Sequence, residues 1–444
     1  MTKQKQSQLP AEISNDFYLS IYQQALRDVK QASQQFNDDI EQAVDAVLST
    51  RTPTGLKSDQ TALLLLALRN PKGEAAQKIL DESQNLRKKL YQNKVAAMVP
   101  IEIGSYCSSN CGFCGWKNSN KEMLRLRVTH EALERQTEYL ASIGFSHFEL
   151  SGGDDLIYLR DHLKEAVQRV KQKAKSINSA ARVSICLTPM SERQYGELAH
   201  AGLDTVLTWQ ETYEREAFNS YVTSGPKAFG IDEDFKLIRN GDGFLARLRS
   251  QENAVRAGLQ VGIGCMLGLA SVPEADILSV IIHGRKLAQH YGETMKPLII
   301  GMPTWNPITT QNSDIRETSG YSFKAEQLFE LVSAIYFLSF PDFLAWVFPN
   351  CRVSKETQIK SILTAGCFTS TMVRVGPGAY LPMDGKDLIA TSNFERSSLD
   401  FEQLDDKKIL EAEQFRHHFD THDNYILKFA KNGLEVVNDS TFLK

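Results

Sequence analysis

The sequence predicts an α/β fold that is organised around a parallel sheet. From about residue 96 onward, short apolar stretches of strand length alternate with longer stretches in which apolar residues recur every three to four positions. Strands that alternate with helices over such a length are typical of a parallel α/β barrel, with an open doubly wound sheet as the alternative. The periodicity alone does not distinguish these two arrangements.

The composition is that of an ordinary globular protein. The 444 residues are 42% hydrophobic and 23% charged, enough for a large core in one elaborated barrel or in two domains. The net charge of -4 gives no reason to expect nucleic acid or membrane as a partner, and the apolar runs are far shorter than a membrane span. The polar start has no apolar signal core, and seven cysteines, an odd number, suit a reducing compartment. We therefore expect a cytoplasmic protein.

The amino-terminal part is expected to be helical. Apolar residues recur at helical spacing in three stretches, residues 13–47, 59–68 and 73–91. Ser58 or Asp59 is a plausible N-cap for the second stretch. These helices are expected to cover the bottom or the side of a barrel. The chain then divides into a helical extension, a barrel and a carboxyl-terminal helical segment, over residues 1–95, 96–380 and 381–444.

Strands and helices follow one another through the expected barrel. The apolar runs predict strands at residues 96–103, 147–153, 183–188, 205–212, 260–269, 297–302, 343–348 and 361–366. Helical spacing predicts helices between them at residues 129–143, 161–176, 191–201, 244–257, 274–291 and 323–338. One link, residues 213–243, is long for a barrel connection and is a candidate lid.

Three cysteines lie directly after the first expected strand. Cys107, Cys111 and Cys114 have the spacing Cys-x-x-x-Cys-x-x-Cys, so three thiolates fall within eight residues. Such a group can converge on one iron–sulfur cluster, whereas a zinc site usually needs a second Cys-x-x-Cys pair, which this chain lacks. The apolar run 96–103 would deliver this loop at the carboxyl end of a buried strand, where barrel enzymes place their chemistry.

With this loop, the chain from about residue 93 to about residue 415 resembles the radical S-adenosylmethionine (SAM) enzymes. It is most similar to the branch that holds biotin synthase, 2-iminoacetate synthase (the tyrosine lyase) and the tryptophan lyase. The resemblance implies a TIM-type barrel and a [4Fe–4S] cluster on Cys107, Cys111 and Cys114. It also implies that one open iron binds SAM, which is cleaved reductively to a 5'-deoxyadenosyl radical. An electron donor such as flavodoxin or ferredoxin is the implied partner.

The resemblance also implies residues that bind SAM. Phe113 matches the aromatic position beside the adenine. Gly152, Gly153 and Asp154 end the second barrel strand, where the family holds glycine followed by an acid for the methionine amino group. Further along the chain, the implied SAM-binding residues are Glu211, in a Gln-Glu-Thr-Tyr stretch, Arg247, with Arg249 as its competitor, and Met266, in a glycine-spaced strand.

The expected substrate end departs from the tyrosine lyase. Residues 301–307 fall where that enzyme carries Pro-Arg-x-Arg-Pro, but Thr304 and Asn306 replace both arginines. A tyrosine carboxylate bound in that way is therefore not expected. Trp305 is a candidate stacking face, and Arg374 is an alternative anchor for an anion.

Three functions remain open on these residues. The first is a carbon–carbon lyase on a small amino-acid-like substrate, and the second is a biotin-synthase-type or mutase enzyme on another metabolite. The third is an iron–sulfur scaffold without radical chemistry, which would tolerate Glu211→Ala. A second cluster is not expected, because no further cysteine motif accompanies Cys186, Cys265, Cys351 and Cys367. The roles of those four cysteines, the substrate and the oligomeric state do not follow from the sequence.

Overall fold

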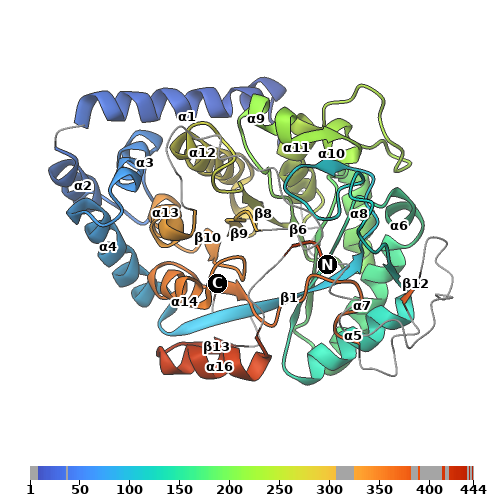
Figure 1. Cartoon of the computed structure of the whole chain (residues 1–444). Helices are drawn as coiled ribbons and strands as arrows, with labels where there is room; N and C mark the ends of the chain where they lie inside the picture. The colour runs from blue at the N-terminus through green and yellow to red at the C-terminus, as the bar shows by residue number, and fades with distance from the viewer. Residues whose placement is uncertain are drawn as a thin grey trace, which may run out of the picture.

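A computed structural model describes residues 9–36, 39–306, 325–381, 389–390, 413–415, 420–437, 440 and 443 of the chain. A curled, mostly parallel sheet forms its centre, and helices surround the sheet (Figure 1). The parallel strands of the barrel wall are β1 (Lys94–Gly104), β4 (His147–Gly152), β5 (Arg182–Cys186), β6 (Thr205–Leu207), β8 (Gln260–Gly264), β9 (Leu298–Gly301), β10 (Ala345–Phe348) and β11 (Phe368–Ser370). The predicted α/β class is confirmed.

The order of the strands shows that the sheet is curled rather than doubly wound. The strands run β10-β9-β8-β6-β5-β4-β1, and β11 pairs with the free side of β1. Where β11 and β10 approach each other, the Cys367 N–H donates to the Val347 carbonyl at 3.3 Å, and no ladder joins them in the described part of the chain. The result is a partly closed barrel, which excludes the open doubly wound alternative.

Helices cover the outside of this sheet. Capping residues stabilise their first turns, and their apolar faces pack against the strands. The covering helices are α5 (His130–Ser142), α6 (Leu156–Asp161), α7 (Leu163–Ile177), α8 (Glu192–Ala201), α11 (Gly243–Arg256), α12 (Pro273–Tyr291), α13 (Ala325–Ser339) and α14 (Lys355–Thr364). Four of these helices, α5, α8, α11 and α14, begin at an N-cap whose side chain accepts a backbone N–H of the first turn: Thr129, Ser191, Asp242 and Ser354. Gly202, with φ of 110°, ends α8.

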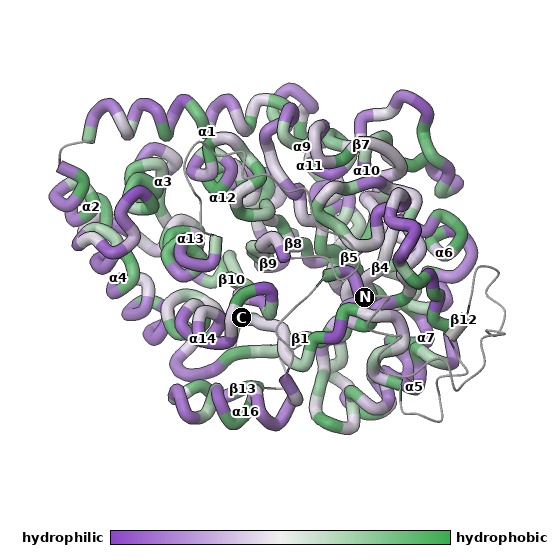
Figure 2. The backbone as a smooth tube through the Cα atoms, in the orientation of Figure 1, coloured by the Kyte–Doolittle hydropathy of each residue, from purple (hydrophilic) through white to green (hydrophobic). Residues whose placement is uncertain are grey.

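The amino-terminal part is helical as predicted and lies along the side of the barrel, but the first expected stretch, residues 13–47, contains two helices instead of one. The helices of this part are α1 (Asn15–Phe36), α2 (Ile40–Ser49), α3 (Ser58–Leu65) and α4 (Glu74–Tyr91), and α1 alternates hydrophilic and hydrophobic residues along its length (Figure 2). Buried Glu252 of α11 anchors this extension, because it accepts the Ile13 N–H at 2.7 Å and the Tyr18 hydroxyl at 3.0 Å. Neither predicted cap starts α3: Lys57 is its N-cap, and the Ser58 hydroxyl donates to Asp28 instead.

One predicted strand is wrong. Residues 361–366 were expected to form the last strand, but residues up to Thr364 belong to α14, and the strand β11 begins only at Phe368. Helical spacing explains the difference, since Ile359 and Ile362 are three positions apart and pack with Tyr425 and Phe429 in a small core cluster. The expected start of the helix at 323–338 lies outside the described residues, and α13 is described from Ala325.

The carboxyl-terminal part adds to the sheet as well as to the helices. It contributes α16 (His422–Lys431) and β13 (Glu435–Val437), and β13 pairs in parallel with the first residues of β1. Among the described residues, no helix combines the length and the apolarity that a membrane crossing needs.

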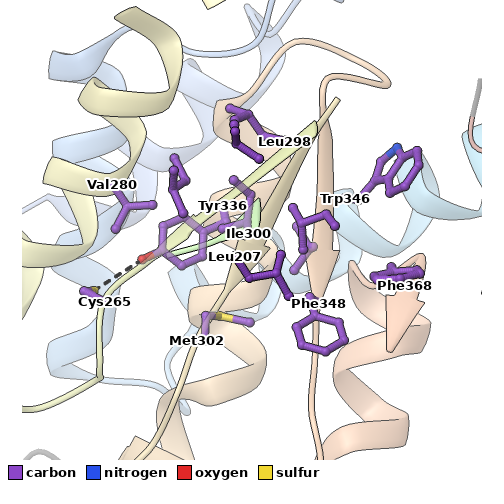
Figure 3. Close-up of a cluster of buried hydrophobic side chains, with 14 of the residues drawn as sticks. Leu207, Cys265, Val280, Leu298, Ile300, Met302, Tyr336, Trp346, Phe348 and Phe368 are labelled. Atoms are coloured by element: carbon purple, nitrogen blue, oxygen red, sulfur yellow. Dashed lines mark hydrogen bonds between the residues drawn. The ribbon is translucent and has the colours of Figure 1, made fainter. Parts of the chain in front are cut away.

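The core fills the barrel and the space between its strands and helices. Figure 3 shows part of it, with Leu298, Ile300 and Trp346 from neighbouring strands and Tyr336 from α13. The Cys265 sulfur lies 3.7 Å from the Tyr336 hydroxyl, so this cysteine packs in the core.

Candidate active site

The cysteine loop follows β1 and is fixed by the long link that was a candidate lid. Cys111 lies in the short strand β2 (Asn110–Cys111), which pairs antiparallel with β7 (Val222–Ser224) of that link. The Gly112 N–H donates to the Tyr221 carbonyl at 2.8 Å. The link is therefore folded against the cysteine loop, where it forms α9 (Arg215–Tyr221) and α10 (Pro226–Phe229) beside β7.

The environment of the three sulfurs fits an iron–sulfur cluster. The N–H groups of Ser109 and Asp154 both lie 3.4 Å from the Cys107 sulfur, and the Gln414 amide lies 3.2 Å from the Cys114 sulfur. Burial raises the pKa of the Cys111 thiol to about 12, with Lys227 opposing the shift. Iron deprotonates a coordinating thiol, and N–H donors stabilise the resulting thiolate.

A single metal ion fits this region less well. Among the described residues, no three histidine, cysteine or acidic side chains gather closely enough to hold one ion. A cluster does not need such a gathering, because its protein sulfurs bind different irons. The assignment of Cys107, Cys111 and Cys114 to a cluster remains a prediction, which the N–H donors around their sulfurs support.

A cavity opens at the carboxyl ends of the strands, beside the cysteine loop. The structure brings to its wall seven of the residues that the sequence singled out: Phe113, Cys114, Gly152, Asp154, Glu211, Arg247 and Met266. They come from the cysteine loop, from the ends of β4, β6 and β8, and from α11. Residues that are far apart in the sequence thus surround one space, as the barrel prediction requires.

A group of three charges forms one wall of this cavity. The Glu211 carboxylate accepts the Lys227 ammonium at 2.7 Å and lies 3.5 Å from the Arg247 guanidinium. The Glu211 and Arg247 side chains are 7% and 5% exposed, so water screens the group little. Burial raises the pKa of Glu211, but Lys227 and Arg247 lower it more, and the net shift is downward. One carboxylate and two cations can hold both charges of a zwitterionic ligand.

The backbone holds Glu211 in an unusual conformation. Its φ is 69°, in the left-handed region that residues other than glycine rarely adopt. The backbone around it is fixed, because the Gln210 N–H donates to the Gly264 carbonyl at 2.8 Å, and the Met266 N–H donates to the Glu211 carbonyl at 2.7 Å. Strained residues held in this way cluster at functional sites.

Asp154 ties the cysteine loop to the neighbouring strands. Its carboxylate accepts the hydroxyls of Ser109 and Thr188, and the Ser109 oxygen also accepts the Lys227 N–H at 2.9 Å. A carboxylate has about four positions for accepting hydrogen bonds, so Asp154 keeps capacity for a ligand ammonium. The same side chain can therefore both position the loop and face the cavity.

Gly153 allows β4 to approach the cysteine loop. A Cβ at this position would meet the Tyr106 carbonyl and lie 2.7 Å from the Cys107 Cβ. We expect Gly153→Ala to displace the loop, to cost about 1–3 kcal/mol of stability and to reduce iron loading, because backbone cannot move aside cheaply. Thermal unfolding and iron content after reconstitution measure both effects.

Gly196, inside α8, provides the control for this prediction. A Cβ there meets nothing within 4 Å, so Gly196→Ala is expected to stabilise the helix by about 0.5–1 kcal/mol and to leave iron loading unchanged. Full iron loading in Gly153→Ala would show that the close approach does not position the cysteines.

The glycine-spaced strand accommodates an indole ring. A Cβ at Gly301 would meet the ring of Trp209, and one at Gly264 would lie 3.2 Å from it. Trp209 lines the cavity, whereas the backbone of these glycines does not. Trp209 thus offers the cavity a flat apolar face beside Met266.

The predicted substrate residues do not line the cavity. Trp305 is 37% exposed, whereas Thr304 and Asn306 are buried. Thr304 and Asn306 instead donate to the carbonyl of Arg352, at 3.4 and 2.9 Å. Arg374 donates to the Ala379 carbonyl, while the valines on either side of it face the cavity.

Five cavity or loop residues escaped the sequence analysis: Glu102, Glu149, Lys227, Arg352 and Gln414. The sequence contained a signal for the two glutamates, since each interrupts an apolar strand. Acidic residues are rarely buried unless they are paired, so such a position indicates a functional or structural role. Lys227 and Arg352 lie in connections without a repeating pattern, so nothing local marked them.

The remaining cysteines divide between cavity and core. Cys186 and Cys351 line the cavity, whereas Cys265 and Cys367 are buried elsewhere. All seven cysteines are described, and none forms a disulfide. No second cluster motif emerges from their positions.

Comparison with known proteins shows which family and which relatives this chain resembles. Residues 101–281 match the model of the radical SAM superfamily. The 2-iminoacetate synthase of Escherichia coli (strain K12) is 26% identical over 274 residues, which cover 61% of this chain and 64% of that protein. The [FeFe] hydrogenase maturase subunit HydE of Thermotoga maritima is 24% identical over 209 residues, 47% of this chain and 53% of that protein. The chain thus spans less than two thirds of the length of either relative.

Solved structures share the fold over nearly the whole chain. The FeFe-hydrogenase maturase HydG of Carboxydothermus hydrogenoformans has a TM-score of 0.72 at 18% identity, and the match covers 95% of this chain and 85% of that one. Methylornithine synthase (PylB) has a TM-score of 0.61 at 18% identity, with 89% and 97% covered. The match of residues 101–281 shows a radical SAM domain, and the cofactors of that superfamily are a [4Fe–4S] cluster and S-adenosylmethionine.

Proposed function

We propose that this radical SAM enzyme cleaves SAM reductively and abstracts hydrogen from a small amino-acid-like substrate, which leads to carbon–carbon cleavage or rearrangement. When bound, the cluster and SAM supply a one-electron cleavage that produces a hydrogen-abstracting radical. The observation that carries the proposal is the shared cavity, which Cys114 and the charges of Glu211, Lys227 and Arg247 line together.

The protein's own side chains have separate tasks in this proposal. Asp154 and Glu211 bind the ammonium of the methionine end of SAM, and Arg247 binds its carboxylate through a charge-assisted contact. Lys227, whose ammonium lies 5.5 Å from the Phe113 ring centre, keeps Glu211 ionised. Trp209 and Met266 offer apolar surface to the adenosine, and the enclosing strands limit the access of water.

The resemblance to the tyrosine lyase supports the lyase outcome, as does the similarity to proteins named 2-iminoacetate synthase. A biotin-synthase-type or mutase reaction on another metabolite is the alternative. We further propose that a flavodoxin or ferredoxin reduces the cluster and that the enzyme works in the cytoplasm, where seven cysteines without a disulfide stay reduced.

An anaerobic assay tests the proposed function. The protein is reconstituted with iron and sulfide, supplied with dithionite and SAM, and assayed for 5'-deoxyadenosine with and without candidate amino acids. Deoxyadenosine that rises with one amino acid supports the proposal, and analysis of the products then separates two fragments from an isomer. No deoxyadenosine, with the cluster demonstrably present, would favour the scaffold hypothesis.

A comparison of two arginines tests the assignment of the SAM site. Arg247→Leu is expected to raise the dissociation constant of SAM about tenfold or more, because it removes a charge-assisted contact from a buried wall. Equilibrium dialysis on the cluster-loaded protein measures the constant. Arg249→Leu is the matched control, since Arg249 lies on the same helix but pairs with Glu12, and it should bind SAM normally. The opposite ranking would move the role to Arg249.

A further inference from the structure

Arg352 is a fixed cation on the cavity wall without a counter-ion. It follows β10, and its guanidinium lies 3.7 Å above the Phe415 ring and donates to the Thr304 carbonyl at 3.3 Å. Thr304 and Asn306 also hold its backbone carbonyl. Among the described residues, no carboxylate lies within ion-pair distance of it. A guanidinium has five N–H donors, so most of its donors remain available to a ligand in the cavity.

The other cations of the cavity are already compensated. Lys227 and Arg247 share the carboxylate of Glu211, whereas Arg352 has only a carbonyl and an aromatic face. Burial lowers the pKa of Arg352 more than the charges around the cavity, Glu211 among them, raise it, and none of these carboxylates is in direct contact with the guanidinium. An anionic ligand group would supply the missing partner, and a planar carboxylate matches the fork of a guanidinium.

Two carboxyl groups face the same cavity from adjacent strands. Glu149 of β4 is in register with Pro100 of β1, and Ser151 of β4 is in register with Glu102 of β1, so both glutamates lie on the same face of the sheet. Glu102 accepts the Ser151 hydroxyl at 2.6 Å. Burial raises the pKa of Glu102 to about 8 and that of Glu149 to about 7. These groups suit a ligand that brings a positive charge or hydrogen-bond donors.

This combination distinguishes between classes of anion. A phosphate would bring up to two negative charges towards one guanidinium and two carboxyl groups, which is unfavourable. A small zwitterion brings one carboxylate for Arg352 and one ammonium for the glutamates. We infer that Arg352 anchors the carboxylate of the substrate, with Glu102 and Glu149 facing its amino group, so that the substrate is a free amino acid. This inference rests on the proposed function and specifies the substrate class for the same cavity.

The test uses the twenty proteinogenic L-amino acids on protein loaded with cluster and SAM. Binding is measured by equilibrium dialysis, and deoxyadenosine formation gives KM and kcat. We expect at least one amino acid to bind and to stimulate deoxyadenosine, and the corresponding amine without a carboxyl group to bind much more weakly. An inert panel, or an amine as effective as its amino acid, would overturn the inference.

Variants then assign the contact to Arg352. Arg352→Met is expected to weaken binding of the active amino acid about tenfold to a hundredfold, with iron loading unchanged, and Arg352→Lys to restore part of it. The matched control is Arg285→Met, because Arg285 also donates to backbone carbonyls but lies on α12 outside the cavity wall. Normal amino-acid binding by Arg352→Met would overturn the assignment.

The two proposals fail in different ways. If wild-type protein forms no deoxyadenosine with its cluster and SAM bound, the proposed function fails. If deoxyadenosine forms but Arg352→Met binds the amino acid normally, only the anchor fails.

Discussion

Replacing Cys111 with alanine is expected to abolish the cluster and, with it, the formation of deoxyadenosine. Cys111 is buried in β2, where its backbone pairs with Val222, so no other side chain can move in to replace its sulfur. Two remaining thiolates hold a four-iron cluster poorly, because three protein ligands are the usual minimum for this chemistry. Iron and sulfide content, the visible absorbance of the reconstituted protein and the deoxyadenosine assay measure the loss.

Cys367→Ala is the matched control. Cys367 is also buried, but it lies beside Tyr91 near the amino-terminal ends of the strands, so its removal should leave iron content at the wild-type level. Near-normal iron absorbance in Cys111→Ala would contradict the assignment of the cysteine loop as the cluster site.

Replacing Glu211 with glutamine is expected to destabilise the protein by about 3–5 kcal/mol, because it leaves two buried cations without their shared counter-ion. The change keeps the size of the side chain, so packing stays nearly constant. Binding of SAM should fall as well, with the cluster still present. Denaturant unfolding and equilibrium dialysis of SAM measure these two effects, and the scaffold hypothesis predicts normal function instead.

The surface pair of Glu192 and Arg256 provides the comparison. Their charged atoms are 2.6 Å apart, but the Glu192 side chain is 42% exposed, so Glu192→Gln should change stability little. The pKa of Glu211 is lowered by folding, and its stabilisation is therefore complete above the ordinary carboxyl pKa and lost as the pH falls. In Glu211→Gln, the free energy of unfolding should therefore fall less steeply as the pH is lowered. The same pH dependence in the variant and the wild-type protein would contradict this prediction.

The sequence predicted the fold well where a local pattern matched the final environment. The apolar run before Cys107 became β1, because periodicity reports burial directly. The resemblance of the Gln-Glu-Thr-Tyr stretch to a family motif identified Glu211, which lines the cavity beyond β6. The strand prediction for residues 361–366 was wrong, because a short apolar run fits a strand or a buried helix equally well.

The site was less predictable because its charges depend on distant contacts. Lys227 reaches Glu211 only because β7 pairs with the cysteine loop, and no local sequence pattern predicts that pairing. Thr304 and Asn306 replace the two arginines of the tyrosine lyase, so the sequence offered Arg374 as an alternative anchor for an anion. The structure instead places the Arg352 guanidinium on the cavity wall, while Thr304 and Asn306 donate to the backbone carbonyl of the same residue.

The contact between Gln414 and Cys114 has a consequence for the order of biosynthesis. The two residues are 300 positions apart, and Phe415, next to Gln414, also stacks on Arg352. At about 5–20 residues per second, the ribosome releases Gln414 roughly 15–60 seconds after Cys114. Cys114 therefore lacks this contact while the barrel is still being synthesised, and Gln414 can pack against it only when synthesis is nearly complete.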